Sequence, residues 1–115
     1  MLEKTNRVNM LFDFYAPLLK DRQKQFLEMY YRDDLTLSEI AELTEVSRQA
    51  VFDQLKRTEA VLEQFEDKLQ LLSRYEHRKR LIMGMLSLVE SNEALDLQSI
   101  RALVKDLATF ELELD

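Results

Sequence analysis

Two helix starts lie close together in the segment Leu35-Thr36-Leu37-Ser38-Glu39-Ile40-Ala41-Glu42-Leu43-Thr44-Glu45-Val46-Ser47-Arg48-Gln49-Ala50-Val51. Thr36 and Glu39 match a capping box, in which each side chain accepts a hydrogen bond from the backbone amide of the other. Ser47 matches a second N-cap, because its hydroxyl can accept from a free amide of the turn that follows. Only the turn Thr44-Glu45-Val46 separates the two helices. This spacing predicts a helix-turn-helix.

Apolar residues at helical spacing continue beyond this motif. No Gly or Pro occurs between Val46 and Met83. Steps of four and three residues, the 3.5-residue period of a coiled-coil seam, join Val51, Leu55, Thr58, Leu62, Phe65, Leu69 and Leu72. We therefore expect one unbroken helix from Ser47 to about Arg80, a rod of ~50 Å at 1.5 Å per residue.

The remaining segments also read as helices. A first helix is expected from Glu3 to Tyr15, ended by Pro17, and a second is expected to begin with Asp21 as its N-cap. The stripe formed by Phe26, Leu27, Tyr30 and Tyr31 has the spacing of a buried face. The nearly all-apolar stretch Leu81–Val89 is expected to be fully buried. Asp96 can cap a last helix whose apolar stripe contains Leu97, Ile100, Leu103, Val104, Leu107 and Phe110.

Composition supports this interpretation. One Gly and one Pro in 115 residues leave almost no positions for hairpin turns, so the fold class is expected to be all-α. The length predicts a single domain over residues 1–115, with the helix-turn-helix part in 1–60 and the long helix and C-terminal helices in 61–115. A chain this small buries limited surface by itself, and we expect its C-terminal region to form a homodimer.

The sequence offers little for catalysis or membrane insertion. His77 is the only His and lies in the basic run His77-Arg78-Lys79-Arg80, where we expect it to be an exposed helix residue. There is no Cys, and a single Gly cannot build a phosphate-binding loop. We therefore expect no enzyme activity, no catalytic residue, no metal and no cofactor. The first residues lack a signal-peptide pattern and no apolar run could span a bilayer, so a soluble, cytoplasmic protein is expected.

Several motifs resemble known bacterial proteins. The helix-turn-helix, from Leu35 to Arg57, resembles the fourth region of sigma factors and has no wing. Over nearly the full chain, from Leu2-Glu3-Lys4-Thr5-Asn6-Arg7 and Phe12-Asp13-Phe14-Tyr15 through Ser47-Arg48-Gln49-Ala50-Val51 to Leu72, the sequence resembles the YlxM family. That resemblance implies a small DNA-binding protein of Gram-positive bacteria. It also implies a link to the signal recognition particle pathway, as an accessory factor or as a regulator of its expression.

The second helix of the motif carries the candidate DNA contacts. With Val51 and Leu55 buried, a 100° step per residue turns Gln49, Phe52, Asp53 and Lys56 outward, with Arg48 at the flank. Arg48 could then read guanine and Gln49 adenine, while basic side chains contact phosphates. Asp53 would repel phosphate unless it accepts from a cytosine amino group, and Phe52 could touch a thymine methyl or pack on a neighbouring helix. The candidate DNA-binding residues are Ser47, Arg48, Gln49, Phe52, Asp53, Lys56 and Arg57.

An alternative remains open at this point. The helices could be a scaffold for protein or RNA contact that reads no bases, an adaptor for the signal recognition particle RNA or its GTPase. A second basic cluster, which would meet RNA phosphates or remain a solvated helix face, contains Arg74, Arg78, Lys79 and Arg80. The net charge of −6 does not decide the matter, because residues 90–115 hold seven acidic and two basic residues and account for most of it. A nearly neutral remainder predicts modest, salt-sensitive binding to nucleic acid.

Overall fold

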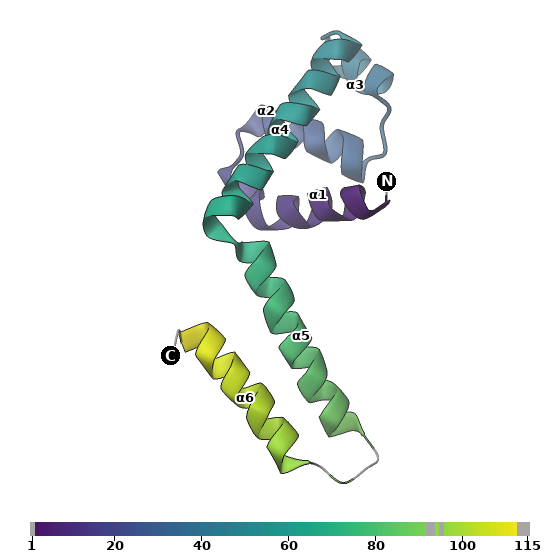
Figure 1. Ribbon diagram of the computed structural model, residues 1–115. Helices are drawn as coiled ribbons and strands as arrows, with labels where there is room; N and C mark the ends of the chain where they lie inside the picture. Colours follow the sequence, from purple (N-terminus) through teal and green to yellow (C-terminus); the bar gives the residue numbers. More distant parts are fainter. Residues whose placement is uncertain (1, 92–93, 95, 113–115) are drawn as a thin grey trace. The chain divides into compact units, whose positions relative to one another are not determined.

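The structure, a computed structural model, describes residues 2–91, 94 and 96–112, and these form helices and no strand (Figure 1). In chain order the helices are α1 (Leu2–Tyr15), η1 (Ala16–Leu18), α2 (Asp21–Leu27), η2 (Glu28–Arg32), α3 (Leu37–Thr44), α4 (Arg48–Leu69), α5 (Leu71–Glu90) and α6 (Leu97–Leu112). The predicted all-α class is confirmed. The chain divides into two compact units, Met1–Leu72 and Ser73–Asp115, whereas the expected subdivision at residue 60 lies inside α4.

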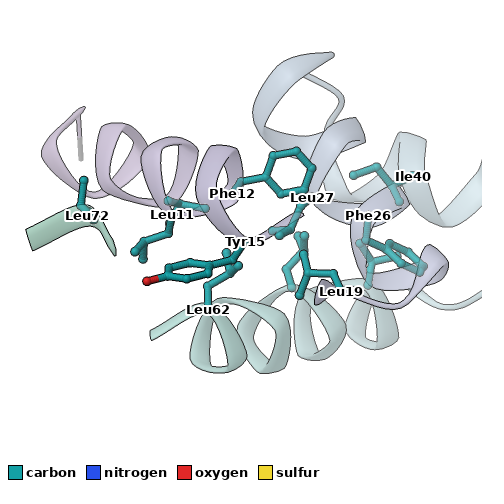
Figure 2. Packing of buried hydrophobic residues seen from close by; sticks show 12 residues of the cluster. Leu11, Phe12, Tyr15, Leu19, Phe26, Leu27, Ile40, Leu62 and Leu72 are labelled. Atoms are coloured by element: carbon teal, nitrogen blue, oxygen red, sulfur yellow. The ribbon is translucent and has the colours of Figure 1, made fainter. Parts of the chain in front are cut away.

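The first unit has a core in which α1, α2 and α3 pack on α4 (Figure 2). Tyr15, Ile40 and Leu62 are completely buried there. The expected seam of α4 is buried through Leu62, and Phe65 packs against the same cluster. Because the three N-terminal helices cover this side of α4 as far as Phe65, this part of the seam needs no second chain to bury it, whereas Leu69 is 48% exposed.

Among the described residues, three use left-handed backbone at helix ends without glycine. Asp34, Glu45 and Gln70 have φ values of 55°, 59° and 55°. Glycine usually fills this role because a Cβ atom makes the left-handed region unfavourable by roughly 1 kcal/mol or more. The turns that the sequence lacked Gly to make are therefore made by polar residues.

Replacing Glu45 with Gly is expected to raise the free energy of unfolding by about 0.5–1 kcal/mol. The substitution relieves the left-handed strain, and the greater backbone freedom of the unfolded Gly chain offsets part of the gain. Urea unfolding followed by circular dichroism measures the change. Glu42→Gly, in the exposed interior of α3, is the matched control and should lower stability by about 1 kcal/mol. A loss of stability in both variants would contradict the prediction.

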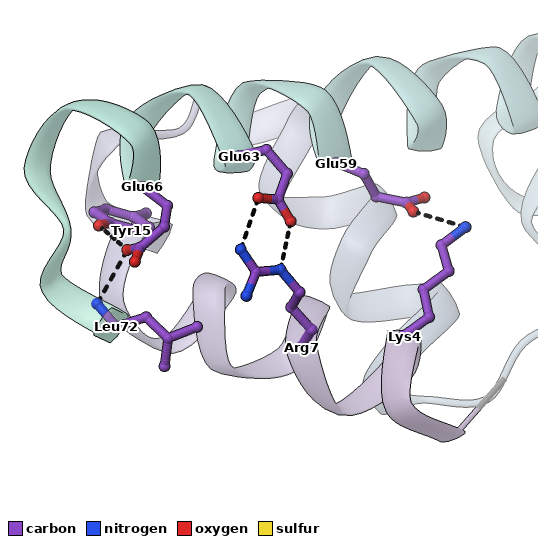
Figure 3. A network of polar contacts seen from close by, with 7 residues as sticks. All are labelled: Lys4, Arg7, Tyr15, Glu59, Glu63, Glu66 and Leu72. Carbon is purple, nitrogen blue, oxygen red and sulfur yellow. Dashed lines mark hydrogen bonds and ion pairs between the residues drawn. The ribbon is translucent and has the colours of Figure 1, made fainter. Parts of the chain in front are cut away.

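The expected unbroken helix from Ser47 to Arg80 is wrong, because α4 ends at Leu69 and α5 begins at Leu71. Buried side chains hold this break (Figure 3). The amide of Leu72 donates to a carboxylate oxygen of Glu66 (3.0 Å). The amide of Leu71 donates to the Tyr15 hydroxyl (3.1 Å). The Tyr15 hydroxyl itself donates to Glu66 (2.6 Å). The Tyr15 hydroxyl and the Glu66 carboxylate thus replace the backbone carbonyls that would accept these bonds in an unbroken helix. No local sequence pattern predicts this replacement.

Two details near α2 also differ from expectation. Asp21 is the first helical residue, and Lys20 occupies the N-cap, where its amide donates to Oε1 of Gln23 (3.0 Å). The segment that follows, η2, is a π-helical turn closed by a bond from the Asp33 amide to the Glu28 carbonyl (2.9 Å). Its wider winding shifts the aromatic stripe out of register, so Phe26 and Leu27 are buried but Tyr30 is 38% exposed and Tyr31 only half-buried.

In the second unit, α5 and α6 form an antiparallel hairpin (Figure 1). The Asp96 cap is confirmed by its bond from the Gln98 amide (3.0 Å). The expected burial of Leu81–Val89 is wrong, because a hairpin of two helices covers only one side of α5. Leu81 is buried, while Ile82 and Val89 are 54% and 67% exposed. His77 is also not freely exposed, because its ring packs on Phe110 with 4.1 Å between centroids.

Candidate nucleic-acid interface

The interface begins with the two caps that fix α3 and α4. The Glu39 amide donates to the Thr36 hydroxyl and the Thr36 amide donates to the Glu39 carboxylate, both at 3.1 Å. The Ser47 hydroxyl accepts from the amide of Ala50 at 3.0 Å. Both predicted caps are confirmed. Since Ser47 uses one lone pair of its oxygen in this way, its hydroxyl proton and its second lone pair remain available to a ligand.

The connection between the helices is short and well held. Glu45 takes the left-handed conformation, and its amide and that of Val46 both donate to the carbonyl of Ala41. Ile40 and Val51, one on each helix, are fully buried where α3 and α4 pack on the core. These contacts orient the opposite side of α4 toward solvent. The residues on that side that the sequence singled out, Arg48, Gln49, Phe52, Asp53, Lys56 and Arg57, are all exposed, as is Ser47.

Two of these side chains are already paired with each other. The Gln49 amide nitrogen donates to a carboxylate oxygen of Asp53 at 3.0 Å, one helical turn away. This bond leaves the Gln49 carbonyl oxygen and one amide hydrogen for a base edge. It also gives Asp53, the residue least suited to a DNA face, a partner within its own helix.

Further along α4, an aromatic ring and two basic side chains surround a shallow hollow. The pocket has a volume of about 360 Å³ and is lined by Phe52, Asp53, Lys56 and Arg57. The Lys56 ammonium lies 5.5 Å from the centroid of the Phe52 ring, and Phe52 is 42% exposed. A ring with a cation over its face can contact a base while the cation reaches a phosphate.

The structure adds residues that the sequence did not indicate. Tyr30, Tyr31 and Arg48 line a second hollow of about 470 Å³ beside the start of α4. The two tyrosine rings meet edge to face, 4.9 Å apart at 86°. A smaller hollow of about 110 Å³ places Lys4 near both tyrosines and Phe52. Helical spacing assigned the tyrosines to the core, and only the π-helical turn reveals that they border the candidate interface.

Lys4, Lys56 and Glu59 form a charged cluster at the edge of this surface. The Lys4 ammonium lies 3.3 Å from the Glu59 carboxylate (Figure 3). Because the two amines lie close together, their coupling raises the pKa of Lys4, with help from the Glu59 carboxylate, and lowers the pKa of Lys56. Burial, followed by the Glu59 charge, raises the pKa of the Tyr31 hydroxyl to about 12. Tyr31 is therefore a neutral hydrogen-bond donor at physiological pH.

The second basic cluster does not form one surface. Arg78 pairs with Glu111 at 2.8 Å, and the Arg74 guanidinium lies 4.7 Å from the centroid of the Phe110 ring. Both side chains thus pack against α6. Lys79 and Arg80 are exposed but point to different sides of α5, since consecutive helical residues are about 100° apart.

The part of the chain that the structure describes has neither of two other kinds of site. No group of three or more His, Cys, Asp or Glu side chains there is arranged to hold a metal ion. None of the described helices combines the length and apolar character needed to cross a membrane.

Capped helices, a three-residue turn and an exposed face on the second helix define a small all-helical protein of the helix-turn-helix class. The chain belongs to the UPF0122 family, whose model matches residues 2–104 and is described as "Putative helix-turn-helix protein, YlxM / p13 like". The resemblance to the YlxM family that the sequence motifs indicated is confirmed.

Relatives in the genus Bacillus are similar over most of the chain. A UPF0122 protein of Bacillus thuringiensis (strain Al Hakam) is 54% identical over 93 residues, which cover 81% of this chain and 84% of the relative. UPF0122 proteins of Bacillus cereus (strain AH187) and Bacillus anthracis (strain A0248) are 53% identical over the same shares.

Proposed function

We propose that this protein binds duplex DNA through the first turns of α4 and acts as a regulatory or accessory factor, without enzymatic activity. The observation that carries the proposal is the exposed side of α4, where Arg48, Gln49 and Phe52 precede Lys56 and Arg57. In a helix-turn-helix, the first turns of the second helix approach base edges and later side chains approach phosphates. The order of side chains along α4 suits that arrangement.

The biological setting is proposed from the family. The YlxM resemblance links the protein to the signal recognition particle pathway of protein export, with a cytoplasmic location and a role in regulation of transcription or in the pathway itself. A homodimer would carry two copies of α4, which would suit a site with two half-sites.

One observation favours a different function. The bond between Gln49 and Asp53 occupies part of the amide that would read adenine and keeps a carboxylate on the DNA face. A protein or RNA adaptor for the signal recognition particle RNA or its GTPase, with no base reading, would tolerate that carboxylate better than a DNA reader. This adaptor is the second candidate function.

An Arg48→Ala variant separates the two candidates. A bidentate Arg–guanine contact contributes about 1–3 kcal/mol of discrimination, so the variant should bind its preferred duplex about 5–150-fold more weakly while its salt-dependent binding to random DNA remains. Fluorescence anisotropy at two salt concentrations, with a duplex selected by the wild type from a random pool, measures both quantities. Binding to the GTPase or the signal-recognition RNA, with no duplex bound at low salt, would support the adaptor instead.

A further inference from the structure

The α5–α6 hairpin has two apolar sides on α5, and α6 covers only one of them. The covered side is defined by its contacts, namely His77 on Phe110, buried Leu81, and Gly84, where a Cβ atom would lie 3.4 Å from Leu103. At 100° per residue, a second apolar stripe lies about 80–140° around the helix from Leu81. Its members are all at least two-fifths exposed: Tyr75 (40%), Ile82 (54%), Leu86 (44%) and Val89 (67%).

Helix α6 carries a matching stripe. Leu103 and Phe110 face α5, whereas Leu97 and Val104 are 60% and 51% exposed and lie about 90–130° around the helix from that contact. Both helices are right-handed, but α6 runs antiparallel to α5. Seen along one common axis, residues therefore advance around the two helices in opposite directions, and the two exposed stripes lie on the same side of the hairpin.

An ion pair confirms this geometry independently. Arg78 lies about 60° around α5 from Leu81, and Glu111 lies about 80–100° around α6 from Leu103 and Phe110, each toward the exposed stripe of its own helix. They could meet only if the two stripes share one side, and they lie 2.8 Å apart. We call this side the apolar face, defined by Tyr75, Ile82, Leu86, Val89, Leu97 and Val104, with Met83 and Leu112 at its edges.

The apolar face is suited to a partner of its own kind. Leu81 is the only buried hydrophobic residue in the described part of the second unit, so the hairpin by itself has almost no core. The exposed fractions of the eight side chains correspond to roughly 750 Å², close to the ~800 Å² per partner of a standard interface. Two such hairpins, packed face to face, would have the arrangement of a four-helix bundle, in which two layers of antiparallel helices enclose apolar stripes of equal length and spacing.

We propose that the apolar face binds the same face of a second copy of this chain, so that two hairpins form a four-helix bundle. A second copy supplies a stripe of the same length and spacing. In a dimer with two-fold symmetry, the same residues form the interface on both copies, so the apolar face of one copy would cover the apolar face of the other. A hollow of about 350 Å³, lined by Tyr75, Arg78, Lys79, Ile82 and Met83, can receive a large apolar side chain from the partner. This inference does not depend on DNA binding.

The mass of the full chain in solution tests the proposal. Sedimentation of the wild type without nucleic acid should give twice 13.7 kDa at micromolar concentration. The double variant Ile82→Glu/Leu86→Glu should sediment at 13.7 kDa, with dimerisation weakened at least 100-fold, because four charges, two from each copy, would be desolvated at the centre of the interface. The matched control Ser87→Glu/Thr109→Glu adds the same charge on the polar side of the hairpin and should remain dimeric.

A second measurement covers the possibility that the glutamate variant unfolds. The chain has no Cys, so Ile82→Cys and Ser87→Cys each introduce one unique thiol. Raising the protein concentration should slow the reaction of Cys at position 82 with maleimide about ten-fold and leave that of position 87 unchanged. A monomeric wild type would overturn the proposal, as would a dimer that survives both glutamates, or a thiol at position 82 whose reactivity does not depend on concentration. A dimer that binds no DNA would overturn only the proposed function.

Discussion

A Glu66→Ala variant is expected to lose about 3 kcal/mol of unfolding free energy. The Glu66 carboxylate accepts from the Tyr15 hydroxyl and from the Leu72 amide, and the structure buries both Glu66 and Tyr15 (Figure 3). Removing this acceptor leaves two buried donors without a hydrogen-bond partner, and each such donor lowers the free energy of unfolding by about 1–3 kcal/mol. It also withdraws the side chain that holds the start of α5. Urea unfolding followed by circular dichroism measures the loss.

Two further substitutions make this expectation specific. Glu66→Gln keeps an oxygen that can accept both bonds, so it should lose only about 1 kcal/mol. Asp67→Ala removes a carboxylate from the next position, which is exposed, and should change stability by less than about 0.5 kcal/mol. If Glu66→Ala were no more destabilising than Asp67→Ala, the network would contribute nothing to the stability of the first unit.

The same network explains why the sequence alone predicted the wrong helix. Helix starts were predictable because Thr36, Ser47 and Asp96 cap their helices through bonds to residues two or three positions away. The break at Gln70 depends on Tyr15, which is distant in sequence and donates to Glu66. A periodic apolar pattern with no Gly or Pro contains no trace of such a bond.

The candidate interface was predictable to a similar extent. Burial of Val51 and Leu55 fixed the side of α4 that faces solvent, and the residues expected there are exposed. Tyr30 could not be assigned to this surface, because the π-helical turn shifts its position around the helix. Lys4 could not be assigned either, because the packing of α1 in the folded chain places it there. In the second unit, periodicity identified the apolar residues of α5 and α6 but not which side of each helix its neighbour covers.

Reversing the charge of Lys56 and Arg57 to Glu is expected to weaken binding to duplex DNA about 100-fold at low salt. Both side chains are exposed beyond the base-reading turn of α4 and border the hollow beside Phe52. Each phosphate contact releases bound counterions, so losing two should lower the slope of log affinity against log salt by about two. Affinity measured by fluorescence anisotropy over a salt series gives both the loss and the slope.

The position of these charges, rather than their number, is what the proposed interface requires. Lys20→Glu/Lys68→Glu makes the same change in net charge at exposed residues of the first unit, at the N-cap of α2 and in the last turn of α4. Since the first 89 residues are almost neutral in sum, this control should lower affinity several-fold through general repulsion and leave the salt slope nearly unchanged. Equal losses of affinity in the two double variants would mean that binding depends only on the overall charge of the protein. Helix α4 would then not be the helix that binds DNA.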